Sequence, residues 1–409
     1  MKVFALGGYG EVGLPAIKLL VKSDLVTEIA VAGRNLELAE KAAREVGLKG
    51  SAVFADGIDQ EELNELLAGY DIIMNSASQD SVLPAIQAAM HSGAHYCDVA
   101  SFGAFVQQVL QHGPEAQAAG IIAVIANGIS PSISNLMGVH VARQLDKVEQ
   151  LQIGRADIFS FESKRDLMPG QQPKDPDDSL VALRECRSYI AWQLKRLEKN
   201  GLRNVLDYQD GQWVEVDPTM SGLEVPLAER ISIKSTPYFS GDDIWGQLPR
   251  GLSNLSPVEM SFSPLPPRLH ALLRKHALSV LSEDIDSEAA TNSFFEVVGR
   301  DPQSWLTYPP DFVLLPKMWV RAVGHKEGRA ARHTSWLTAP MWNVGGFFLT
   351  SVALAVAVLK ILRGEVQERG VMHAEIAFEP QSFFDEIGAM LPEPPPDGKL
   401  IGESFEWLE

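Results

Sequence analysis

Two hydrophobic patterns alternate along the first 130 residues of the chain. Apolar runs occupy residues 3–6, 28–32, 52–55, 72–75, 96–100 and 121–126, while residues 12–22, 36–46, 60–67 and 82–92 place apolar side chains every three or four positions. The runs have the length of buried strands, and the spaced stretches have the period of amphipathic helices. This alternation predicts an α/β domain of the Rossmann type, in which a doubly wound parallel sheet carries helices on both faces.

The pattern changes after about residue 135. Polar and apolar residues alternate in the segments 150–159, 212–216, 230–236, 294–298, 317–323 and 371–378. Such alternation is typical of antiparallel strands that expose one face. Two stretches with helical spacing, 178–200 and 269–281, interrupt it. We therefore predict a second α+β domain with a mostly antiparallel sheet and helical insertions.

An uncharged stretch towards the C-terminus is nearly long enough to suggest a membrane span. Residues 344–359 contain no charged side chain, but they include Gly345, Gly346, Thr350 and Ser351. They are also shorter than the roughly 20 residues that a helix needs to cross a bilayer. We expect a buried helix here and no membrane span.

Composition narrows the classes of function. The 409 residues include 35 Lys and Arg against 53 Asp and Glu, and the resulting net charge of −18 disfavours binding to nucleic acid or an anionic membrane. The two cysteines, Cys97 and Cys186, cannot build a disulfide framework and fit a reducing compartment. The N-terminal stretch MKVFALGG is too short for the apolar core of a signal peptide. We expect a cytoplasmic globular protein.

A glycine motif follows the first predicted strand. It reads Gly8-Tyr9-Gly10-Glu11-Val12-Gly13, a GxGxxG at the start of the first predicted helix. In this context the glycines permit a tight turn, a close approach of the backbone to a pyrophosphate, and close packing of helix on strand. The helix N-terminus adds free N–H groups and the positive end of its dipole. We expect these six residues to bind a dinucleotide.

The end of the second predicted strand bears on the choice between the two nicotinamide cofactors. An acidic residue there would bind the ribose 2′-hydroxyl of NAD, whereas an arginine would bind the 2′-phosphate of NADP. The strand is followed by Gly33-Arg34-Asn35, without Asp or Glu. Arg34 and Asn35 therefore favour NADP over NAD, unless Arg34 is a solvated residue that stacks on adenine without selecting the cofactor.

Small or polar residues follow the other predicted strands. In a doubly wound sheet, ligands bind outside the carboxyl ends of the strands, so these residues are candidates for cofactor binding. Turns favour the same residue types, which leaves a purely structural role open at each position. The candidates are Asp56 after the third strand, Asn75, Ser76, Ala77 and Ser78 after the fourth, Ala100 after the fifth and Gly128 after the sixth.

The glycine motif is one of several segments that point together to one family. The others are AGRNLELAEKAA, DIIMNSASQDSVLPAIQAAMHSGAHYCDVAS, NGISPSISNLMG, VRAVGHKEGRAARHT and GVMHAE. In this order they resemble the saccharopine dehydrogenase-like family, which includes saccharopine reductases and carboxynorspermidine dehydrogenases. The chain departs from that pattern at residues 129–132, where the family often has Asp and Gly, and at His373-Ala374-Glu375, where it often has a Pro-Glu pair. For residues 159–293 we find no counterpart.

The resemblance implies a domain organisation and an activity. It implies a Rossmann domain over residues 1–135 with a returning helix at about 344–363. It also implies a second domain, residues 136–343 and 364–395, that closes over the substrate and supports a homodimer, with a tail at 396–409. The implied activity is that of an NADP-dependent oxidoreductase acting on a C–N bond of a small-molecule substrate that is an amino acid or is derived from an imine.

Reduction by a nicotinamide also needs a group that moves a proton. Tyr96 and Asp98 lie two residues apart on the fifth predicted strand, so their side chains should point to one face and that of Cys97 to the other. Asp98, at the carboxyl end of the strand, is our first candidate for proton transfer or for holding a substrate ammonium, and Tyr96 is the second. Each could equally be structural, with Asp98 capping a turn and Tyr96 filling the core.

The sequence indicates no other catalytic group. It contains no HExxH, CxxC or GxSxG motif, so we expect neither a metal site nor a nucleophilic serine. The basic residues Lys326, Arg329, Arg332 and His333 form either a site for a substrate carboxylate or, more simply, a solvated turn. Two other functions stay open, namely a non-catalytic NADP-binding scaffold and a reductase of an apolar unsaturated substrate.

Overall fold

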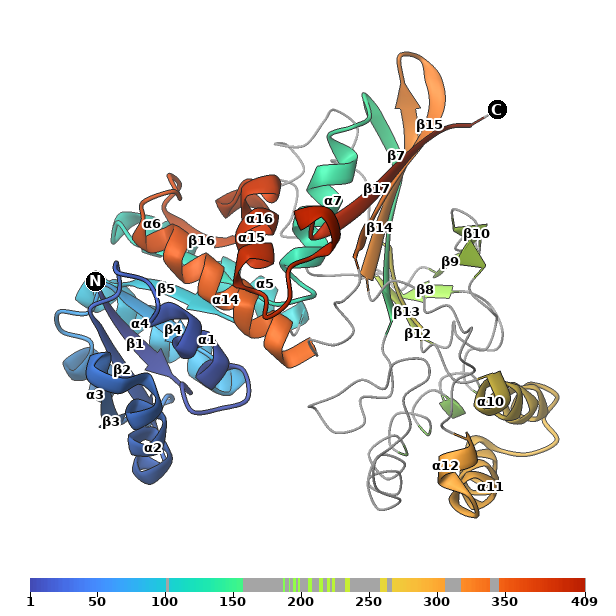
Figure 1. Ribbon diagram of the computed structural model, residues 1–409, viewed down its shortest axis with the longest axis horizontal. Coiled ribbons are helices and arrows are strands. Elements are labelled where there is room, and N and C mark those ends of the chain that lie inside the picture. Colours follow the sequence, from blue (N-terminus) through green and yellow to red (C-terminus); the bar gives the residue numbers. More distant parts are fainter. Residues whose placement is uncertain are drawn as a thin grey trace. The chain divides into compact units, whose positions relative to one another are not determined.

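The chain divides into two compact units (Figure 1). The computed structural model describes residues 1–100, 103–156, 267–305, 318–338 and 346–408, with residues 187, 191, 194, 195, 198, 205–207, 213–215, 219–220, 223–224, 232–235 and 258–262. The first unit contains Met1–Gln144 and Gly346–Leu400, and the second contains the other described residues. The chain thus leaves the first unit after Gln144, belongs to it again from Gly346, and leaves it once more after Leu400.

A seven-stranded sheet in the order β16-β6-β5-β4-β1-β2-β3 forms the centre of the first unit. All neighbouring strands in it are parallel. The order runs outward from β1 and β4, and the carboxyl ends of these two strands mark the switch point where doubly wound sheets bind ligands. The strands are β1 (Lys2–Leu6), β2 (Glu28–Gly33), β3 (Gly50–Phe54), β4 (Ile72–Asn75), β5 (His95–Asp98), β6 (Ile122–Ile125) and β16 (Gly370–His373).

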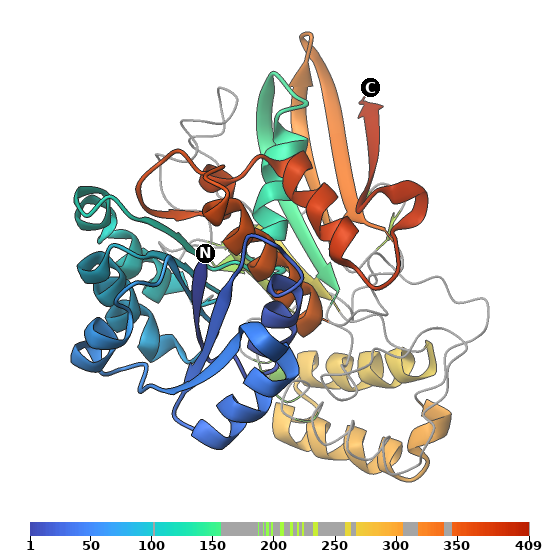
Figure 2. The same cartoon turned by 60° about the vertical axis from the view of Figure 1, so that its left-hand side comes forward.

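Helices cover both faces of this sheet, and Figure 2 shows the strands between them. Residues of α3 (Gln60–Leu66), α4 (Val82–Ser92), α5 (Gly103–Leu110) and α6 (Gly113–Ala118) share one core with Phe4, Ile73 and Tyr96 of the strands. α1 (Gly13–Leu20) contacts α2 (Leu36–Val46) and packs on α14 (Gly346–Leu362), which lies against β4 and β5. The predicted Rossmann-type domain is confirmed, and its first six strands lie within a few residues of their predicted positions.

Local sequence determines where several of these helices begin and end. The side chain of Asn35 accepts a hydrogen bond from Leu38 N at 3.0 Å and caps α2, and that of Asp59 accepts one from Glu62 N at 3.0 Å and caps α3. α4 ends at Gly93, whose φ of +75° is a left-handed conformation that glycine adopts without strain.

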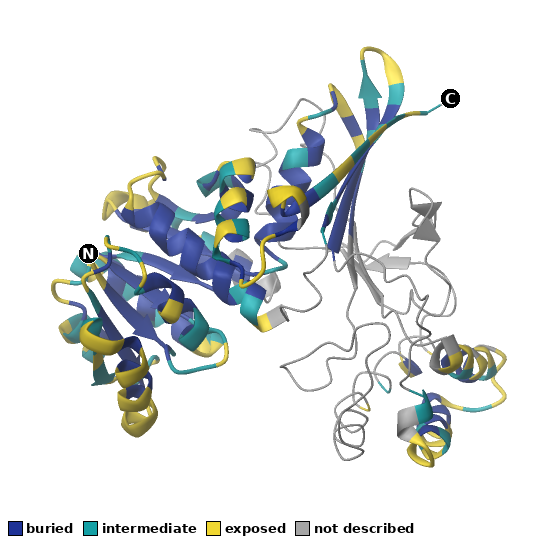
Figure 3. Cartoon of the chain, viewed as in Figure 1, coloured by how far each residue is buried: buried dark blue, intermediate teal, exposed yellow. Residues whose placement is uncertain are grey.

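The uncharged stretch forms α14, as expected for a buried helix. Its residues 351–362 are all buried (Figure 3). Among the residues described by the structure, no helix is long and apolar enough to cross a membrane.

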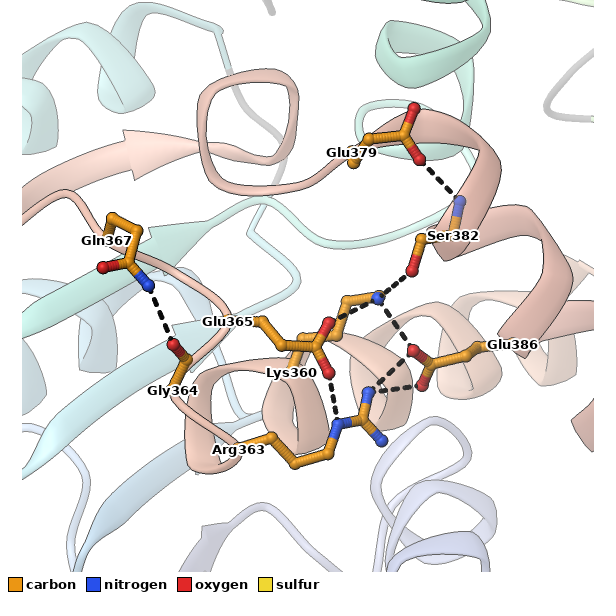
Figure 4. Close-up of polar contacts among 8 residues, drawn as sticks. All are labelled: Lys360, Arg363, Gly364, Glu365, Gln367, Glu379, Ser382 and Glu386. Atoms are coloured by element: carbon orange, nitrogen blue, oxygen red, sulfur yellow. Dashed lines mark hydrogen bonds and ion pairs between the residues drawn. The ribbon is translucent and has the colours of Figure 1, made fainter.

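A buried charge marks the last turn of α14 (Figure 4). The side chain of Lys360 is only 3% exposed, and its Nζ lies 2.8 Å from Glu365 Oε2, 2.7 Å from Ser382 Oγ and 2.7 Å from Glu386 Oε1. Arg363 pairs with the same two carboxylates. Because Ser382 and Glu386 belong to α16 (Pro380–Met390), these contacts fasten α16 to the end of α14.

Residues 364–395 lie in the first unit, and their assignment to the second domain is wrong. Gly370 of β16 lies opposite Ile122 of β6, and His373 lies opposite Ile125. β16 leads into α15 (Ala374–Ala377) and α16, and both helices pack on α7 (Ile133–Ala142). The prediction of an antiparallel strand over 371–378 fails because a short alternating run does not determine which sheet its strand joins.

A six-stranded sheet in the order β12-β13-β7-β14-β15-β17 forms the second unit. Its pairs are antiparallel except for the parallel pair of β13 with β7, so the predicted, mostly antiparallel sheet is confirmed. Two short pairs accompany it, β8 (Val205–Asp207) with β9 (Trp213–Glu215) and β10 (Thr219–Met220) with β11 (Leu223–Glu224). The six strands are β7 (Lys147–Ala156), β12 (Ser232–Ser235), β13 (Val258–Phe262), β14 (Met318–Lys326), β15 (Arg329–Leu337) and β17 (Ile401–Trp407).

Helices interrupt this second unit. They are α10 (Pro267–Leu281), α11 (Ser287–Gly299) and α12 (Pro302–Trp305). α10 confirms the helix predicted at 269–281, but the predicted strand at 294–298 is wrong because it lies within α11. Asp286 caps α11 by accepting a hydrogen bond from Ala289 N at 2.7 Å, and Ala290, Phe294 and Val298 are buried at helical spacing. Most of the helix predicted at 178–200 lies outside the described residues.

The C-terminal segment contains a strand, and the prediction of a tail over 396–409 is wrong from Ile401 onward. β17 runs antiparallel to β15, with Ile401 opposite Leu337 and Trp407 opposite Ala331. It forms the edge of the sheet. The proline-rich residues before it gave no indication of this pairing, because the partner strand lies some 70 residues earlier in the chain.

The basic residues of the β14–β15 hairpin contact β17. Arg332 pairs with Glu406, and His333 Nε2 lies 3.5 Å from Glu403 Oε2. Lys326 and Arg329 lie over the rings of Phe405 and Trp407, at 5.4 and 4.2 Å from their centroids. These contacts give the basic residues a structural role within the second unit.

Candidate cofactor and active site

The glycine turn joins β1 to α1. Gly7 N–H donates to Ala32 O at 2.8 Å and ties the turn to β2, while Gly10 N–H donates to Gly7 O at 2.9 Å and closes it. Gly7 has a φ of +76°, a conformation that side chains other than glycine rarely adopt. The motif therefore forms the tight turn that the sequence predicts.

The glycines of the motif differ in the space around them. A Cβ on Gly13 would lie 2.3 Å from Gly7 O, and one on Gly8 would lie 2.9 Å from Ala5 O. A Cβ on Gly10 would meet only Gly7 O, at 3.3 Å. Gly8 and Gly13 are thus required for packing, whereas Gly10 leaves open the space that a pyrophosphate needs to approach the backbone.

The N-terminus of α1 is uncapped. Val12 precedes the helix in a helical conformation, no side chain caps it, and the first turn contains no acidic residue. The start of a helix carries the positive end of its dipole, although in α1 Leu14 N–H already donates to Gly10 O at 2.9 Å and Pro15 has no N–H. Together with the open space at Gly10, this helix start fits the pyrophosphate of a dinucleotide.

The loop after β4 supports the glycine turn. Ser76 Oγ donates to Gly7 O at 3.1 Å, and Ala77 N–H donates to Asn75 Oδ1 at 3.0 Å. A Cβ on Gly7 would lie 2.7 Å from Ala77 N, so loop and turn are in close contact. The structure therefore places Asn75 and Ser76 as supports of the turn, while Ala77 and Ser78 are exposed beside it.

Tyr9 connects the glycine turn to the end of β2. A Cβ on Gly33 would lie 2.6 Å from the Tyr9 ring, so the ring covers this glycine closely. Asn35 N–H donates to Tyr9 Oη at 3.2 Å. The Asn35 side chain caps α2 with its Oδ1, and a contact of Asn35 with a cofactor stays a prediction. Arg34 is exposed, and within the described part of the chain it forms no ion pair.

Asp56 lies after β3 at the same sheet edge. Its N–H donates to Glu62 Oε2 at 2.8 Å, and its Oδ1 accepts from Ile58 N–H at 3.4 Å. Asp56 is half-buried. These contacts hold the turn from β3 to α3, and a contact of Asp56 with the adenosine end of a cofactor stays a prediction.

Tyr96 and Asp98 point to the same face, as predicted, and contact each other. Tyr96 Oη donates to Asp98 Oδ2 at 2.9 Å and accepts from Asn75 Nδ2 at 3.0 Å. Asp98 Oδ1 accepts from Ala126 N–H at 2.7 Å and from Ala100 N–H at 3.1 Å. This network ties together the carboxyl ends of β4, β5 and β6.

Burial raises the pKa values of both side chains of this pair. It raises the pKa of Asp98 to about 6, although the N–H groups of Ala126 and Ala100 and the Tyr96 hydroxyl oppose the shift. Burial and then the neighbouring Asp98 carboxylate raise the pKa of Tyr96 well above its usual value. Tyr96 is 0% and Asp98 1% exposed, and every oxygen of the pair already has a partner. The geometry favours a positioning role, and a catalytic role for either residue stays a prediction.

The turn after β6 packs closely on α14. Gly128 N–H donates to Pro131 O at 3.0 Å, and Asn127 Nδ2 donates to Val124 O at 2.8 Å. A Cβ on Gly128 would lie 3.3 Å from Thr350 Cγ2 of α14. Gly128 is buried, so the structure assigns it a packing role, and its contact with the cofactor stays a prediction.

A second polar group lies at the carboxyl ends of β6 and β16. Ser132, Ser134 and Asn135 stand at the start of α7, His373 ends β16, and Glu375 follows in α15. All five are buried. We name these residues the β6–β16 polar cluster.

Several atoms of this cluster lack partners. Ser134 Oγ donates to Asn135 Oδ1 at 3.1 Å, and Asn135 Nδ2 donates to Glu375 Oε2 at 3.1 Å. Glu375 Oε1, Ser132 Oγ and both ring nitrogens of His373 have no hydrogen-bond partner among the described residues. Buried polar atoms without partners are costly, so they are expected where a ligand supplies the partner.

The two titratable groups of the cluster are both driven towards their neutral forms. Burial raises the pKa of Glu375 to about 8, while its own backbone N–H and Asn135 oppose the shift. Burial also lowers the pKa of His373 to about 4, against a smaller effect of the Ile125 backbone. At neutral pH this cluster therefore presents an uncharged imidazole and a carboxylic acid.

Sequence reasoning did not select these residues. Positions 129–132 and 373–375 stood out only as departures from a family pattern, and residues 371–378 were assigned to the wrong sheet. The available signal was a polar triplet, His373-Ala374-Glu375, directly after a short apolar run. Across the residues that the structure describes, no group of three or more His, Cys, Asp or Glu side chains is placed to hold a metal ion.

Known proteins match the chain in two ways. Residues 3–124 match the family model described as the saccharopine dehydrogenase NADP binding domain. This range contains the glycine turn, Arg34 and all strands from β1 to β5. The sequence match therefore covers the predicted cofactor-binding residues except Gly128, and it does not cover the β6–β16 polar cluster.

A solved structure shares the fold. A saccharopine dehydrogenase (L-Glu forming) from Saccharomyces cerevisiae aligns over 99% of both chains with a TM-score of 0.60 and 15% identity. At this identity the likeness establishes the fold alone. A short chain dehydrogenase/reductase family protein aligns with 31% of this chain and 72% of its own, at 16% identity and a TM-score of 0.26, which is too low to support an argument.

Proposed function

We propose that the chain is an NADP-dependent oxidoreductase similar to the saccharopine dehydrogenases and that it acts on a C–N bond of an amino acid or imine-derived substrate. The family, the cofactor and the class of enzyme agree with the predictions from the sequence. The match of residues 3–124 is the observation that carries the proposal.

The residues of the first unit have distinct roles in this proposal. The turn around Gly10 and the start of α1 would hold the pyrophosphate, and exposed Arg34 would pair with the 2′-phosphate of the adenosine ribose. When bound, the cofactor supplies the hydride. The nicotinamide end would lie towards the carboxyl ends of β5, β6 and β16, where Asp98 ties the strands together and the β6–β16 polar cluster offers unpaired polar atoms.

Two measurements test the proposal. Calorimetry with apoprotein is expected to show tighter binding of NADPH than of NADH. The absorbance of NADPH is then followed with cyclic imines and with pairs of a keto acid and an amine, and at least one is expected to be reduced. A protein that binds neither nucleotide contradicts the cofactor assignment, and one that binds NADPH but reduces no imine contradicts the substrate class.

The same assay separates the alternatives. Reduction of conjugated C=C substrates without reduction of imines would favour a reductase of an apolar unsaturated substrate. NADPH binding without oxidation by any substrate would favour a scaffold. The unpaired polar atoms of Glu375, Ser132 and His373 favour an oxidoreductase over a scaffold, because a reduction needs a proton donor and a scaffold does not.

Two further expectations accompany this proposal. The small-molecule substrate would be handled by a homodimer, and the protein would be cytoplasmic. Light scattering of the purified protein tests the first expectation, and fractionation of the cells that produce it tests the second.

A further inference from the structure

The β6–β16 polar cluster places a carboxylic acid with one unpaired oxygen at the sheet edge where the proposed reaction occurs. We infer that Glu375 donates the proton to the substrate nitrogen when the C=N bond is reduced. This inference rests on the proposed function and adds to it the residue that completes the reaction. No part of the match to known families reaches Glu375.

The hydrogen bond from Asn135 determines which oxygen of Glu375 carries the proton. Ser134 Oγ donates to Asn135 Oδ1, so the amide nitrogen of Asn135 faces Glu375 and donates to its Oε2. Oε2 then acts as the carbonyl oxygen of the acid. The acidic proton is left on Oε1, the oxygen that has no partner in the described structure.

Glu375 is better suited to proton donation than Asp98. Both Asp98 oxygens accept hydrogen bonds, and Asp98 is 1% exposed. Glu375 has a free oxygen and keeps 7% of its surface exposed. A pKa of about 6 leaves Asp98 mostly ionised at neutral pH, whereas a pKa of about 8 keeps Glu375 mostly protonated.

The position of Glu375 in the sheet agrees with this role. β16 pairs with β6, and β6 pairs with β5, all in parallel, so Glu375 follows a strand end two strands from that of Asp98. Two strand spacings amount to about 10 Å. Ligands of a doubly wound sheet lie outside these carboxyl ends, within reach of a side chain there.

Among the described residues, few charged groups surround Glu375. The elements that pack on α15 are α7, β16 and β6, and their titratable groups are His140, Arg143 and His373. Arg143 ends α7 and lies 4.0 Å from Glu379, and His140 contacts the Phe384 ring. The shift in the pKa of Glu375 is dominated by burial, and none of His140, Arg143, His373 and Glu379 is among its causes.

The proposed step balances in atoms and electrons. The imine carbon receives a hydride from the reduced cofactor, the π bond between carbon and nitrogen breaks, and the nitrogen takes the proton from Glu375 Oε1. The imine is reduced to an amine and the cofactor is oxidised. Glu375 is left as a carboxylate and regains its proton from water.

Glu375→Gln tests the step, because the amide has the shape of the acid and can accept from Asn135 but has no transferable proton. With NADPH and a reducible imine, we expect kcat to fall about 10²-fold or more. The decline of wild-type kcat above pH 8 should be absent in the variant. Its affinity for NADP⁺ should stay within about twofold of wild type. An unchanged kcat would overturn the inference.

Two further variants show whether a fall in kcat comes from the lost proton or from a disturbed fold. Glu368→Gln makes the same change at an exposed position before β16 and is expected to leave kcat unchanged. Glu375→Asp retains an acid but withdraws it by one methylene, so its kcat should lie between those of wild type and Glu375→Gln. If Glu375→Asp were as slow as Glu375→Gln although both bind NADP⁺ normally, the transferable proton would not be the decisive property.

An infrared measurement tests Glu375 without any turnover. The difference spectrum between wild type and Glu375→Gln should contain the C=O band of a carboxylic acid at neutral pH, and the band should titrate near pH 8. A carboxylate band at neutral pH would overturn the inference, whatever the wild type reduces. A wild type that shows the acid band but reduces no imine would contradict the proposed function instead.

Discussion

Tyr96 Oη and Asp98 Oδ2 share a hydrogen bond of 2.9 Å inside the first unit, and Asn75 Nδ2 donates to the same hydroxyl at 3.0 Å. The pair is therefore saturated by its neighbours from β4 and β6. A residue that keeps three strand ends aligned also determines the position of any ligand that binds at those ends. Removing it should disturb the structure before it disturbs the chemistry.

We expect Asp98→Asn to lower the free energy of unfolding by about 1–3 kcal/mol. The Asn amide would face the Tyr96 hydroxyl, which already accepts from Asn75, so a donor would meet an occupied acceptor. The measurement is urea unfolding, with kcat determined on the same samples. A fall in kcat of about 10²-fold or more at unchanged stability would restore Asp98 as a proton-transfer residue.

Alanine at Gly10 and at Gly13 should have different effects. At Gly10 the new Cβ meets only Gly7 O at 3.3 Å, so the protein should fold but bind NADPH more weakly, because the methyl group fills the space above the turn. At Gly13 it would lie 2.3 Å from Gly7 O and 2.5 Å from Ser76 Oγ, so stability should fall. Thermal unfolding and NADPH titration of both variants separate the two roles. Equal losses of stability would contradict them.

Arg34→Ala should raise the KM for NADPH much more than the KM for NADH. The reason is that the exposed guanidinium at the end of β2 would pair with the 2′-phosphate, which NADH lacks. Arg44→Ala, which removes an exposed arginine of the same helix region, is the matched control and should change neither constant. Equal effects of Arg34→Ala on the two cofactors would refute the selection of NADP by this residue.

The stability of the protein should depend on pH through Glu375. Its pKa is 4.5 in the unfolded chain and about 8 in the fold, so between these values the folded state holds a proton that the unfolded state has released. Stability from this group is therefore complete at low pH and is lost as pH rises towards 8, by up to about 1.4 kcal/mol per pH unit.

Glu375→Gln removes this dependence. The difference in unfolding free energy between wild type and the variant should shift in favour of the variant from about pH 5 to about pH 9. His373, whose lowered pKa has the opposite sign of effect between about 4 and 6.5, is present in both proteins and cancels in the difference. A difference that is independent of pH would show that Glu375 has an ordinary pKa in the fold.

Lys360→Met should destabilise the contact between α14 and α16. The substitution keeps the length of the side chain but leaves Glu365 and Glu386 with Arg363 as their cation. Because these two carboxylates are 41% and 26% exposed, we expect a loss of roughly 1–3 kcal/mol, below that of a fully buried pair. Urea unfolding measures it, and Lys22→Met at an exposed position after α1 is a control for loss of a lysine alone.

The parts of the fold that were predictable have local signals. β1 to β6 follow from apolar runs between amphipathic stretches, and the common orientation of Tyr96 and Asp98 follows from the two-residue period of a strand. The turn around Gly8 and Gly13 was predictable because each of these two glycines closely contacts backbone atoms within a few residues of itself.

The predictions that failed concern segments whose structure depends on residues far away in the chain. β16 and β17 are short runs whose sheets are decided by β6 and β15, far away in the chain. Glu375 likewise owes its raised pKa to burial, and the hydrogen bond that leaves one of its oxygens unpaired comes from Asn135, 240 residues earlier. Asn35 shows a different limit, because its residue type suits both a cofactor contact and a helix cap, and the structure uses it as the cap.

The path of the chain through its two units limits how the protein can be cut. A fragment that stops at residue 144 lacks α14 and β16, so the outer edge of β6 would lose its partner and the apolar sides of α1, β4 and β5 would face water. Open strand edges and bare apolar surface promote aggregation. A soluble minimal nucleotide-binding fragment would therefore have to be engineered as a fusion, with residues 346–400 spliced directly after residue 144.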